Sequence, residues 1–136
     1  MPRLLFLLLL LLAAAPGCLL RGGGGVPEWI DNPPADRDHL YAIGSYVGSL
    51  YPEDNRRNAT KEAIRNLSAQ IRTRVKDRRT MTGAGNATMV RRRAEMVAEN
   101  AVRNAQPVAF WVDREGRVEG GREGTVYVLV RAPIAP

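Results

Sequence analysis

Residues 26–34 read VPEWIDNPP and residues 39–45 read HLYAIGS, and the rest of the chain is organised around this stretch. The double proline that ends the first segment fixes φ and pushes Asn32 out of the helical region, which predicts extended chain followed by a turn. The β-type residues that come next predict a first strand from His39 to Val47, with Gly44 as a break.

The segment before this stretch has the features of an export signal. A positively charged start is followed by an apolar run from Leu4 to Ala15. A helix needs about 20 apolar residues to span a bilayer. The run is shorter than that, so we interpret residues 1–17 as a signal peptide. The alternative is an uncleaved N-terminal anchor, because Leu19 and Leu20 prolong the apolar character.

Cys18 is the only cysteine of the chain and lies just after the apolar run. A lone cysteine in an exported protein has no internal disulfide partner, so it pairs between chains, stays free or is modified. Residues 15–18 read APGC and resemble the lipobox of bacterial lipoproteins, although alanine stands where leucine is usual and proline follows it. This resemblance predicts a lipid on Cys18, and Leu19 in place of aspartate implies transport to the outer membrane.

Cleavage near Ala15 would instead give a soluble exported enzyme or ligand-binding domain. In the lipoprotein interpretation, residues 18–25 form the lipidated start and a tether, which ends in four consecutive glycines. A glycine run of this kind is a flexible spacer. The folded domain is therefore expected to occupy residues 26–136.

The charge balance is basic, with 20 Lys and Arg residues against 14 acids. A net positive charge attracts nucleic acid or anionic surfaces. An export signal argues against a nucleic-acid partner, which leaves either an anionic envelope surface or an ordinary solvated surface.

Two helical patterns follow the first strand. The first spans about Asp54 to Arg78, where basic and polar residues separate apolar ones that recur at threes and fours. Its apolar stripe contains Ala59, Ala63, Ile64, Leu67, Ile71 and Val75. The second begins after Asn86, a suitable N-cap, and Pro107 ends it. Its apolar face contains Met89, Val90, Ala94, Val97, Ala98, Ala101, Val102 and Ala105.

Two strands close the domain. Residues 108–113 predict one strand, and residues 125–130 predict another, which has the strongest β-propensity of the chain. The order strand, helix, helix, strand, strand predicts an α+β two-layer sandwich. In it, a three-stranded, mainly antiparallel sheet is covered on one face by two helices.

The opening stretch is similar to that of a known family. Residues 27–34, PEWIDNPP, followed by YAIG at 41–44, resemble the opening motif of the LPP-twenty family of bacterial outer-membrane lipoproteins. Residues 110–113 and 127–131 match the way such domains close, whereas the loop between them, at 116–124, is longer than expected.

The family resemblance implies a non-enzymatic lipoprotein of the outer membrane, with its domain facing the periplasm or the cell surface. It implies attachment to the membrane through the lipid anchor. The partner that we expect for the domain is an envelope protein or a second copy of the chain. The resemblance names no catalytic residue.

The residues themselves offer little for catalysis. His39 is the only histidine, which argues against a multi-histidine metal site, and no cofactor is predicted. Glu95 and Glu99 lie one helical turn apart, but arginines flank them, so surface ion pairs are their expected use. The arginine run at 91–93 either docks on phosphate or lies on the solvated side of its helix.

Three apolar residues are candidates for binding a partner or for anchoring the core: Trp29, Ile30 and Trp111. Prolines on both sides restrain Trp29 and Ile30, so these residues lose little entropy on docking. We predict that both fold back over an apolar edge of the helix–sheet core. The alternative is that Trp29 stands exposed as a partner contact, and Trp111 has the same two interpretations.

Overall fold

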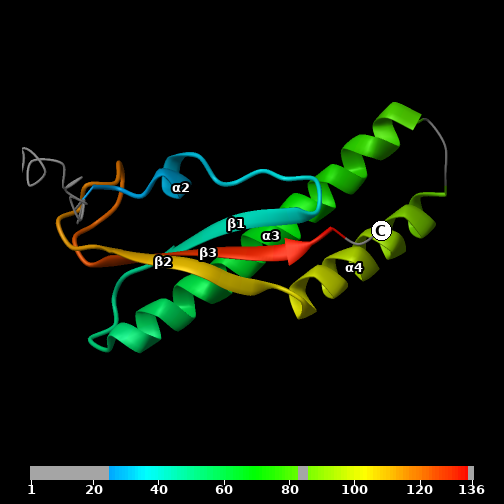
Figure 1. The fold of residues 1–136 in the computed structure, drawn as a ribbon. Coiled ribbons are helices and arrows are strands. Elements are labelled where there is room, and N and C mark those ends of the chain that lie inside the picture. Colours follow the sequence, from blue (N-terminus) through cyan, green and yellow to red (C-terminus); the bar gives the residue numbers. More distant parts are fainter. Residues whose placement is uncertain (1–24, 83–85, 135–136) are drawn as a thin grey trace, which may run out of the picture.

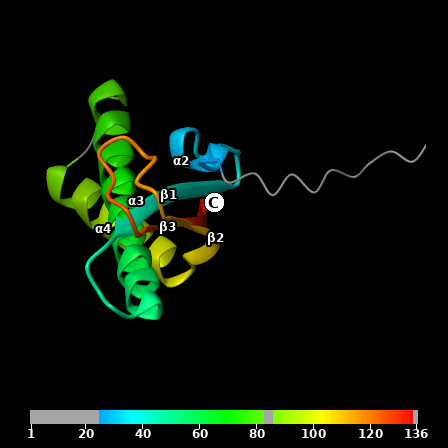
Figure 2. The same cartoon turned by 90° about the vertical axis from the view of Figure 1, so that its left-hand side faces the viewer.

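A three-stranded antiparallel sheet, in the order β1-β3-β2, forms the middle of the domain. The computed structural model describes residues 25–82 and 86–134. Its elements are α2 (Glu28–Asp31), β1 (His39–Tyr46), α3 (Pro52–Thr82), α4 (Ala87–Arg103), β2 (Gln106–Asp113) and β3 (Thr125–Pro133). Helices α3 and α4 lie on one face of the sheet, and α2 lies on the side of the other face (Figure 1 and Figure 2). This arrangement confirms the predicted α+β architecture.

The hydrophobic core lies between the sheet and the two long helices. β3 is the central strand, and its residues from Thr125 to Val130 are all buried. The core contains Leu40, Ala42, Ala59, Ala63, Leu67, Ile71, Ala98, Ala101, Val126, Val128, Val130 and Ala132. Ile64 and Val75, the remaining members of the predicted stripe on α3, pack against this cluster. Burial of this apolar surface is the main stabilising contribution to the fold.

β1 runs without interruption from His39 to Tyr46, so the prediction that Gly44 breaks the strand is wrong. Gly44 is buried and faces α3, where a Cβ would collide with backbone atoms of Ala59 and Ala63. The glycine therefore allows the strand and the helix to approach closely.

The prediction that residues 26–34 form extended chain is wrong for part of this stretch. Residues 28–31 form the single turn α2, which closes with a 2.8 Å hydrogen bond from the Asn32 N–H to the carbonyl oxygen of Glu28. Pro27, at φ −61°, has a fixed conformation that suits the entry into this turn. Asn32 leaves the helical region at φ −127°, as expected of a residue before proline.

The helix α3 is longer than predicted, and α4 is shorter. The side-chain oxygen of Asn86 accepts a hydrogen bond from the Thr88 N–H at 3.0 Å, which confirms the predicted N-cap. α4 ends at Arg103, and Pro107 lies in β2 instead of ending the helix.

Met89 is 71% exposed, so its assignment to the buried face of α4 is wrong. The reason is that the first turns of α4 extend beyond the sheet (Figure 1).

The loop between β2 and β3, residues 114–124, folds around Asp113 at the end of β2. The two carboxylate oxygens of Asp113 accept hydrogen bonds from the N–H groups of Arg117 and Val118, both at 2.9 Å. The Gly124 N–H donates to the carbonyl oxygen of Asp113 at 2.6 Å. These bonds close the long loop and return the chain into β3.

The predicted signal peptide at 1–17, Cys18 and nearly all of the tether lie outside the described residues. Within the part of the chain that the structure describes, no helix combines the length and apolar character needed to cross a membrane.

Candidate functional site

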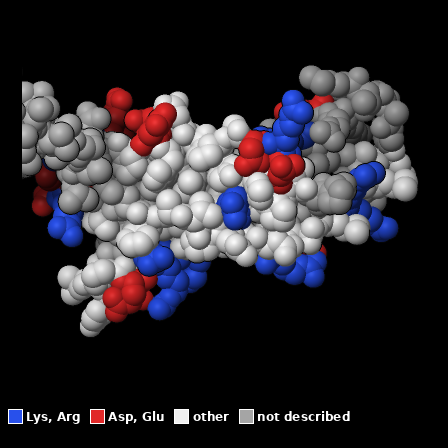
Figure 3. Space-filling view, in the orientation of Figure 1, with Lys and Arg blue, Asp and Glu red and all other residues white. Residues whose placement is uncertain are grey.

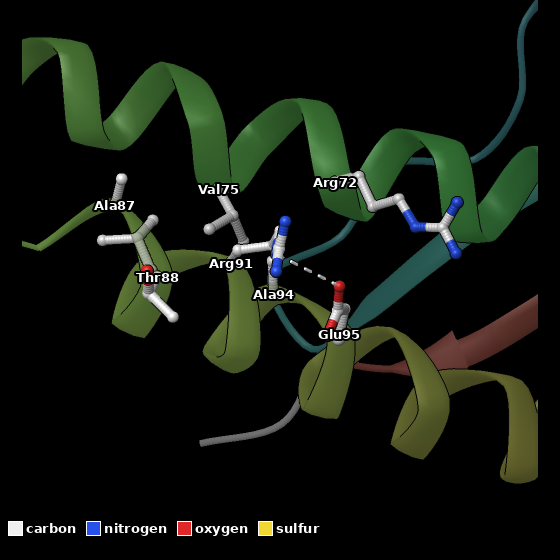
Figure 4. Close-up of a pocket in the computed structure, with 8 residues that line it drawn as sticks. Arg72, Val75, Ala87, Thr88, Arg91, Ala94 and Glu95 are labelled. Atoms are coloured by element: carbon white, nitrogen blue, oxygen red, sulfur yellow. Dashed lines mark ion pairs between the residues drawn. The ribbon is translucent and has the colours of Figure 1, made fainter.

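A groove of about 590 Å³ lies between α3 and α4 (Figure 4). Its lining residues are Arg72 and Val75 from α3, and Ala87, Thr88, Val90, Arg91, Ala94 and Glu95 from α4. The Val75 and Ala87 side chains point into the space between the helices, and Arg91 stands at its edge beside Glu95. The groove therefore has an apolar floor and a charged rim.

A second hollow, of about 300 Å³, continues the groove along α4. It shares Arg72 and Glu95 with the first hollow and adds Ser68, Ala98, Glu99, Val102 and Arg103. The two hollows therefore lie next to each other along the helix pair. A concave apolar surface with a few polar groups at its rim is typical of a binding site.

Small residues on α4 explain why the groove is open. Ala94 and Ala98 are buried where α4 meets α3, and their small side chains allow close contact there. Nearer the start of α4, Ala87 and Thr88 are too short to fill the space opposite Val75. The helices therefore touch along part of their length and leave a hollow beside their outer turns.

The helical layer carries the positive charge of the molecule. α3 and α4 contain 13 basic and six acidic residues, a net charge of +7, whereas the whole chain carries +6. Figure 3 shows the side of the sheet opposite these helices, where the middle of the surface carries few charged residues. The helical layer is therefore the side that attracts an anionic partner.

The charged candidates of α4 lie on its surface. The arginine run at 91–93 is exposed. Arg91 Nε lies 3.8 Å from Glu95 Oε1, which confirms the predicted ion-pair use of Glu95; an exposed pair of this kind contributes little to stability. Glu95 and Glu99 are both exposed, so they do not form the buried carboxylate pair that acid–base catalysis would need.

A separate polar cluster lies where the chain enters β1. One oxygen of Asp36 accepts a hydrogen bond from the Tyr41 hydroxyl at 2.7 Å, and the other lies 3.2 Å from His39 Nδ1. The hydrogen bond from the Tyr41 hydroxyl is the main reason that the pKa of Asp36 falls to about 2. Partial loss of solvent around the carboxylate acts in the opposite direction and raises the pKa. Hydrogen bonds from the N–H groups of Asp38 and His39 lower the pKa further. The same carboxylate raises the pKa of Tyr41.

The Asp36 cluster joins a carboxylate, an imidazole and a phenol. Among the hydrogen bonds of the described residues, none joins His39 to a serine, threonine or cysteine. The cluster also lies outside the groove. Its bonds to the backbone fasten the start of β1, which is a structural role.

Asp113 is the other perturbed carboxyl group. Its side chain is fully buried, and burial by itself would raise the pKa. Hydrogen bonds from backbone N–H groups, led by those of Val118 and Arg117, outweigh this effect and lower the pKa of Asp113. Burial and the nearby Asp113 charge raise the pKa of Tyr127. These contacts organise the β2–β3 loop and do not lie in the groove.

The three predicted apolar candidates lie away from the groove. Trp29 and Ile30 are half-buried in α2, on the side of the sheet opposite α3, and not at the edge of the core between helices and sheet (Figure 2). Trp111 is half-buried and packs on Tyr127, with 5.9 Å between the ring centroids. Cys18 lies outside the described residues.

The sequence did not predict a groove between the two helices: Arg72 and Thr88 were not candidates, and Val75 was predicted only as a member of the apolar stripe. The feature of the sequence that could have indicated the groove is the pair of short residues at 87–88, at the start of the second helix. That signal can be interpreted only when the register between the two helices is known. In the described ranges, no group of three or more His, Cys, Asp or Glu side chains is placed to hold a metal ion.

No protein-family model matches the sequence, and no curated protein is significantly similar to it. The relation to the LPP-twenty family stays a prediction from the motif at 27–44.

Proposed function

We propose that this chain is a non-enzymatic lipoprotein of the bacterial outer membrane, anchored by a lipid on Cys18, with a small domain that binds another envelope protein. One observation carries the proposal. An apolar run, the APGC sequence at 15–18 and a glycine run directly precede the domain, whose first element begins at Glu28. A flexible spacer lets an anchored domain reach a partner.

The groove between α3 and α4 supports the binding part of the proposal. Its length along two helices and its apolar floor suit an amphipathic helix or an extended segment of a partner protein. The net positive charge of the helical layer suits acidic residues on the flanks of that segment.

Membrane fractionation of cells that produce the wild type or Cys18→Ala tests the anchor. We expect the wild type in the membrane fraction and the variant in the soluble periplasmic fraction. Equal solubility of the two forms would contradict the proposal. The mass of the mature N-terminus adds an independent result, because cleavage near Ala15 without lipid supports the soluble exported enzyme or ligand-binding domain.

Filling the groove tests its role. Ala87→Leu and Thr88→Phe place larger side chains in the hollow at exposed positions, where the fold has room for them. We expect these variants to lose the envelope protein that cross-links to the wild type in cells. Met96→Leu is the matched control, because Met96 is 70% exposed and does not line the groove. Equal cross-linking by all variants would exclude the groove as the contact.

A further inference from the structure

The connection between β1 and α3 presents two large apolar side chains to solvent. Leu50 is 96% exposed and Tyr51, next to it, is 64% exposed. Scattered apolar residues on a surface need no explanation, but an adjacent pair on a projecting loop is a candidate contact.

The loop that carries this pair is held in place. The Asn55 side chain, which is buried, accepts a hydrogen bond from the Ser49 N–H and donates one to the Ser49 carbonyl oxygen, both at 2.9 Å. The Tyr51 N–H donates to Ser49 Oγ at 3.1 Å. The Asp54 N–H in turn donates to the carbonyl oxygen of Tyr51 at 3.1 Å. Leu50 and Tyr51 are therefore presented by a preorganised turn, which reduces the entropy lost on binding.

The loop lies at the same end of the molecule as the start of the described chain. In Figure 1 the chain enters the domain at the end where the β1–α3 loop projects, and Figure 2, viewed from that end, shows both toward the viewer. Gly25 is seven residues after Cys18 in the sequence. At about 3.5 Å per residue, this length of extended chain reaches no more than roughly 25 Å. A lipid on Cys18 would therefore keep this end close to the bilayer.

We propose that Leu50 and Tyr51 insert into the surface of the bilayer that holds the lipid anchor, as a second attachment of the domain. This inference rests on the proposed lipid anchor at Cys18. Tyrosine is enriched at the membrane interface, where its ring lies among the headgroups and its hydroxyl stays hydrated. Among the described residues, Leu50 covers almost no apolar surface, because its side chain is 96% exposed. The second contact orients the domain, with the far ends of α3 and α4 directed away from the membrane.

The contact is apolar in character. The first turns of α3 carry Glu53 and Asp54 together with Arg56 and Arg57, so their charges cancel. Asp54 and Arg57 pair with each other at 3.2 Å. Insertion is therefore expected in vesicles with and without anionic lipid, and at high as well as low salt.

A spin label at the loop tests this inference in the full, lipid-anchored chain. Leu50→Cys introduces the only free thiol, because Cys18 is the single native cysteine and carries the lipid. The chain is reconstituted into vesicles of phosphatidylcholine, alone or with phosphatidylglycerol. We expect the label to collide with dissolved oxygen, which concentrates in the bilayer, and to be shielded from a water-soluble nickel complex. Met89→Cys, at a 71% exposed position near the far end of the domain, is the matched control and should show the opposite pattern.

The outcomes separate this inference from the proposed function. Vesicle-bound chain whose label at position 50 is open to the nickel complex overturns the loop insertion and leaves the anchor intact. A label shielded from both reagents indicates a protein contact, and also overturns it. A chain that does not float with the vesicles overturns both proposals. In the unsubstituted chain, hydroxyl-radical oxidation of Tyr51 should fall several-fold on vesicle binding, while that of Met89 stays the same.

Discussion

Gly44 of β1 lies against Ala63 of α3 so closely that a Cβ on Gly44 would lie 2.8 Å from the Ala63 Cα, and closer still to neighbouring backbone atoms. These atoms belong to the helix backbone, so no side chain can move aside to relieve the contact. The strand and the helix must separate if Gly44 gains a side chain.

Forcing extra carbon into a packed core typically costs about 1–3 kcal/mol and occasionally more. Because the contact here is with backbone atoms, we expect Gly44→Ala to destabilise the domain by about 3 kcal/mol or more. Chemical denaturation followed by circular dichroism measures the effect. Ser45→Ala, at the exposed neighbouring position, is the control and should change little. Equal stability of Gly44→Ala and the wild type would show that α3 does not pack on β1 in this way.

Asp113 predicts a pH dependence of stability. Its pKa in the folded state is lower than the ordinary value of 3.8, so the unfolded chain binds the proton more readily. The stability that this carboxylate contributes is complete above that value and is lost as the pH falls through the lower folded pKa. Unfolding measured between neutral and strongly acidic pH should show this loss, and part of it should be absent in Asp113→Asn.

Asp113→Asn should also lower stability at neutral pH. The amide offers one acceptor oxygen where the carboxylate has two, and a buried N–H left without an acceptor costs about 1–3 kcal/mol. Glu119→Gln, an exposed change in the same loop, is the control for the loss of one charge. Asp36 keeps its own lowered pKa in both variants, so some acid sensitivity remains.

The aromatic pair of Trp111 and Tyr127 should show measurable coupling in stability. Their rings are 5.9 Å apart and tilted by 34°, a geometry in which aromatic pairs contribute about 0.5–1.5 kcal/mol beyond burial. A double-mutant cycle with leucine at each position measures this energy. The same cycle on Trp111 and Tyr46, which is not part of this ring pair, should be additive within about 0.5 kcal/mol.

Trp29→Ala should lower stability by about 1–2 kcal/mol, because its side chain is half-buried and loses only part of its contact with water on folding. A fully buried aromatic would cost about 3–5 kcal/mol. Thermal melts of the wild type and Trp29→Ala measure the loss and show whether it matches a half-buried or a fully buried side chain. Glu28→Ala, in the same turn, is the control. An unchanged melting temperature would make Trp29 a partner contact in place of a packing residue.

The helix patterns were strong enough to be predicted from the sequence. The apolar residues of α3, from Ala59 to Val75, recur at the helical period over more than four turns, and Asn86 is a typical N-cap. The strand at 125–130 was equally clear from its β-propensity, and the structure shows it buried as the central strand. Local periodicity and local hydrogen bonding determine these features, so the sequence alone carries them.

Other features depend on contacts between residues far apart in the chain. Gly44 looked like a strand break, since its contact with α3 cannot be inferred from its sequence neighbours. Met89 fitted the apolar face of its helix, but the sheet ends before it can cover that turn.

The sequence by itself determined the order of the elements, the apolar stripes, the N-cap and the α+β class, because each of these follows from short-range periodicity and backbone preference. The tertiary structure alone decided where the groove between α3 and α4 lies and which apolar residues remain exposed. It also decided that the β1–α3 loop lies at the end where the chain enters the domain. The physical reason is that burial is a property of the assembled surface. A residue's exposure depends on which distant segment covers it, and no local pattern contains that information.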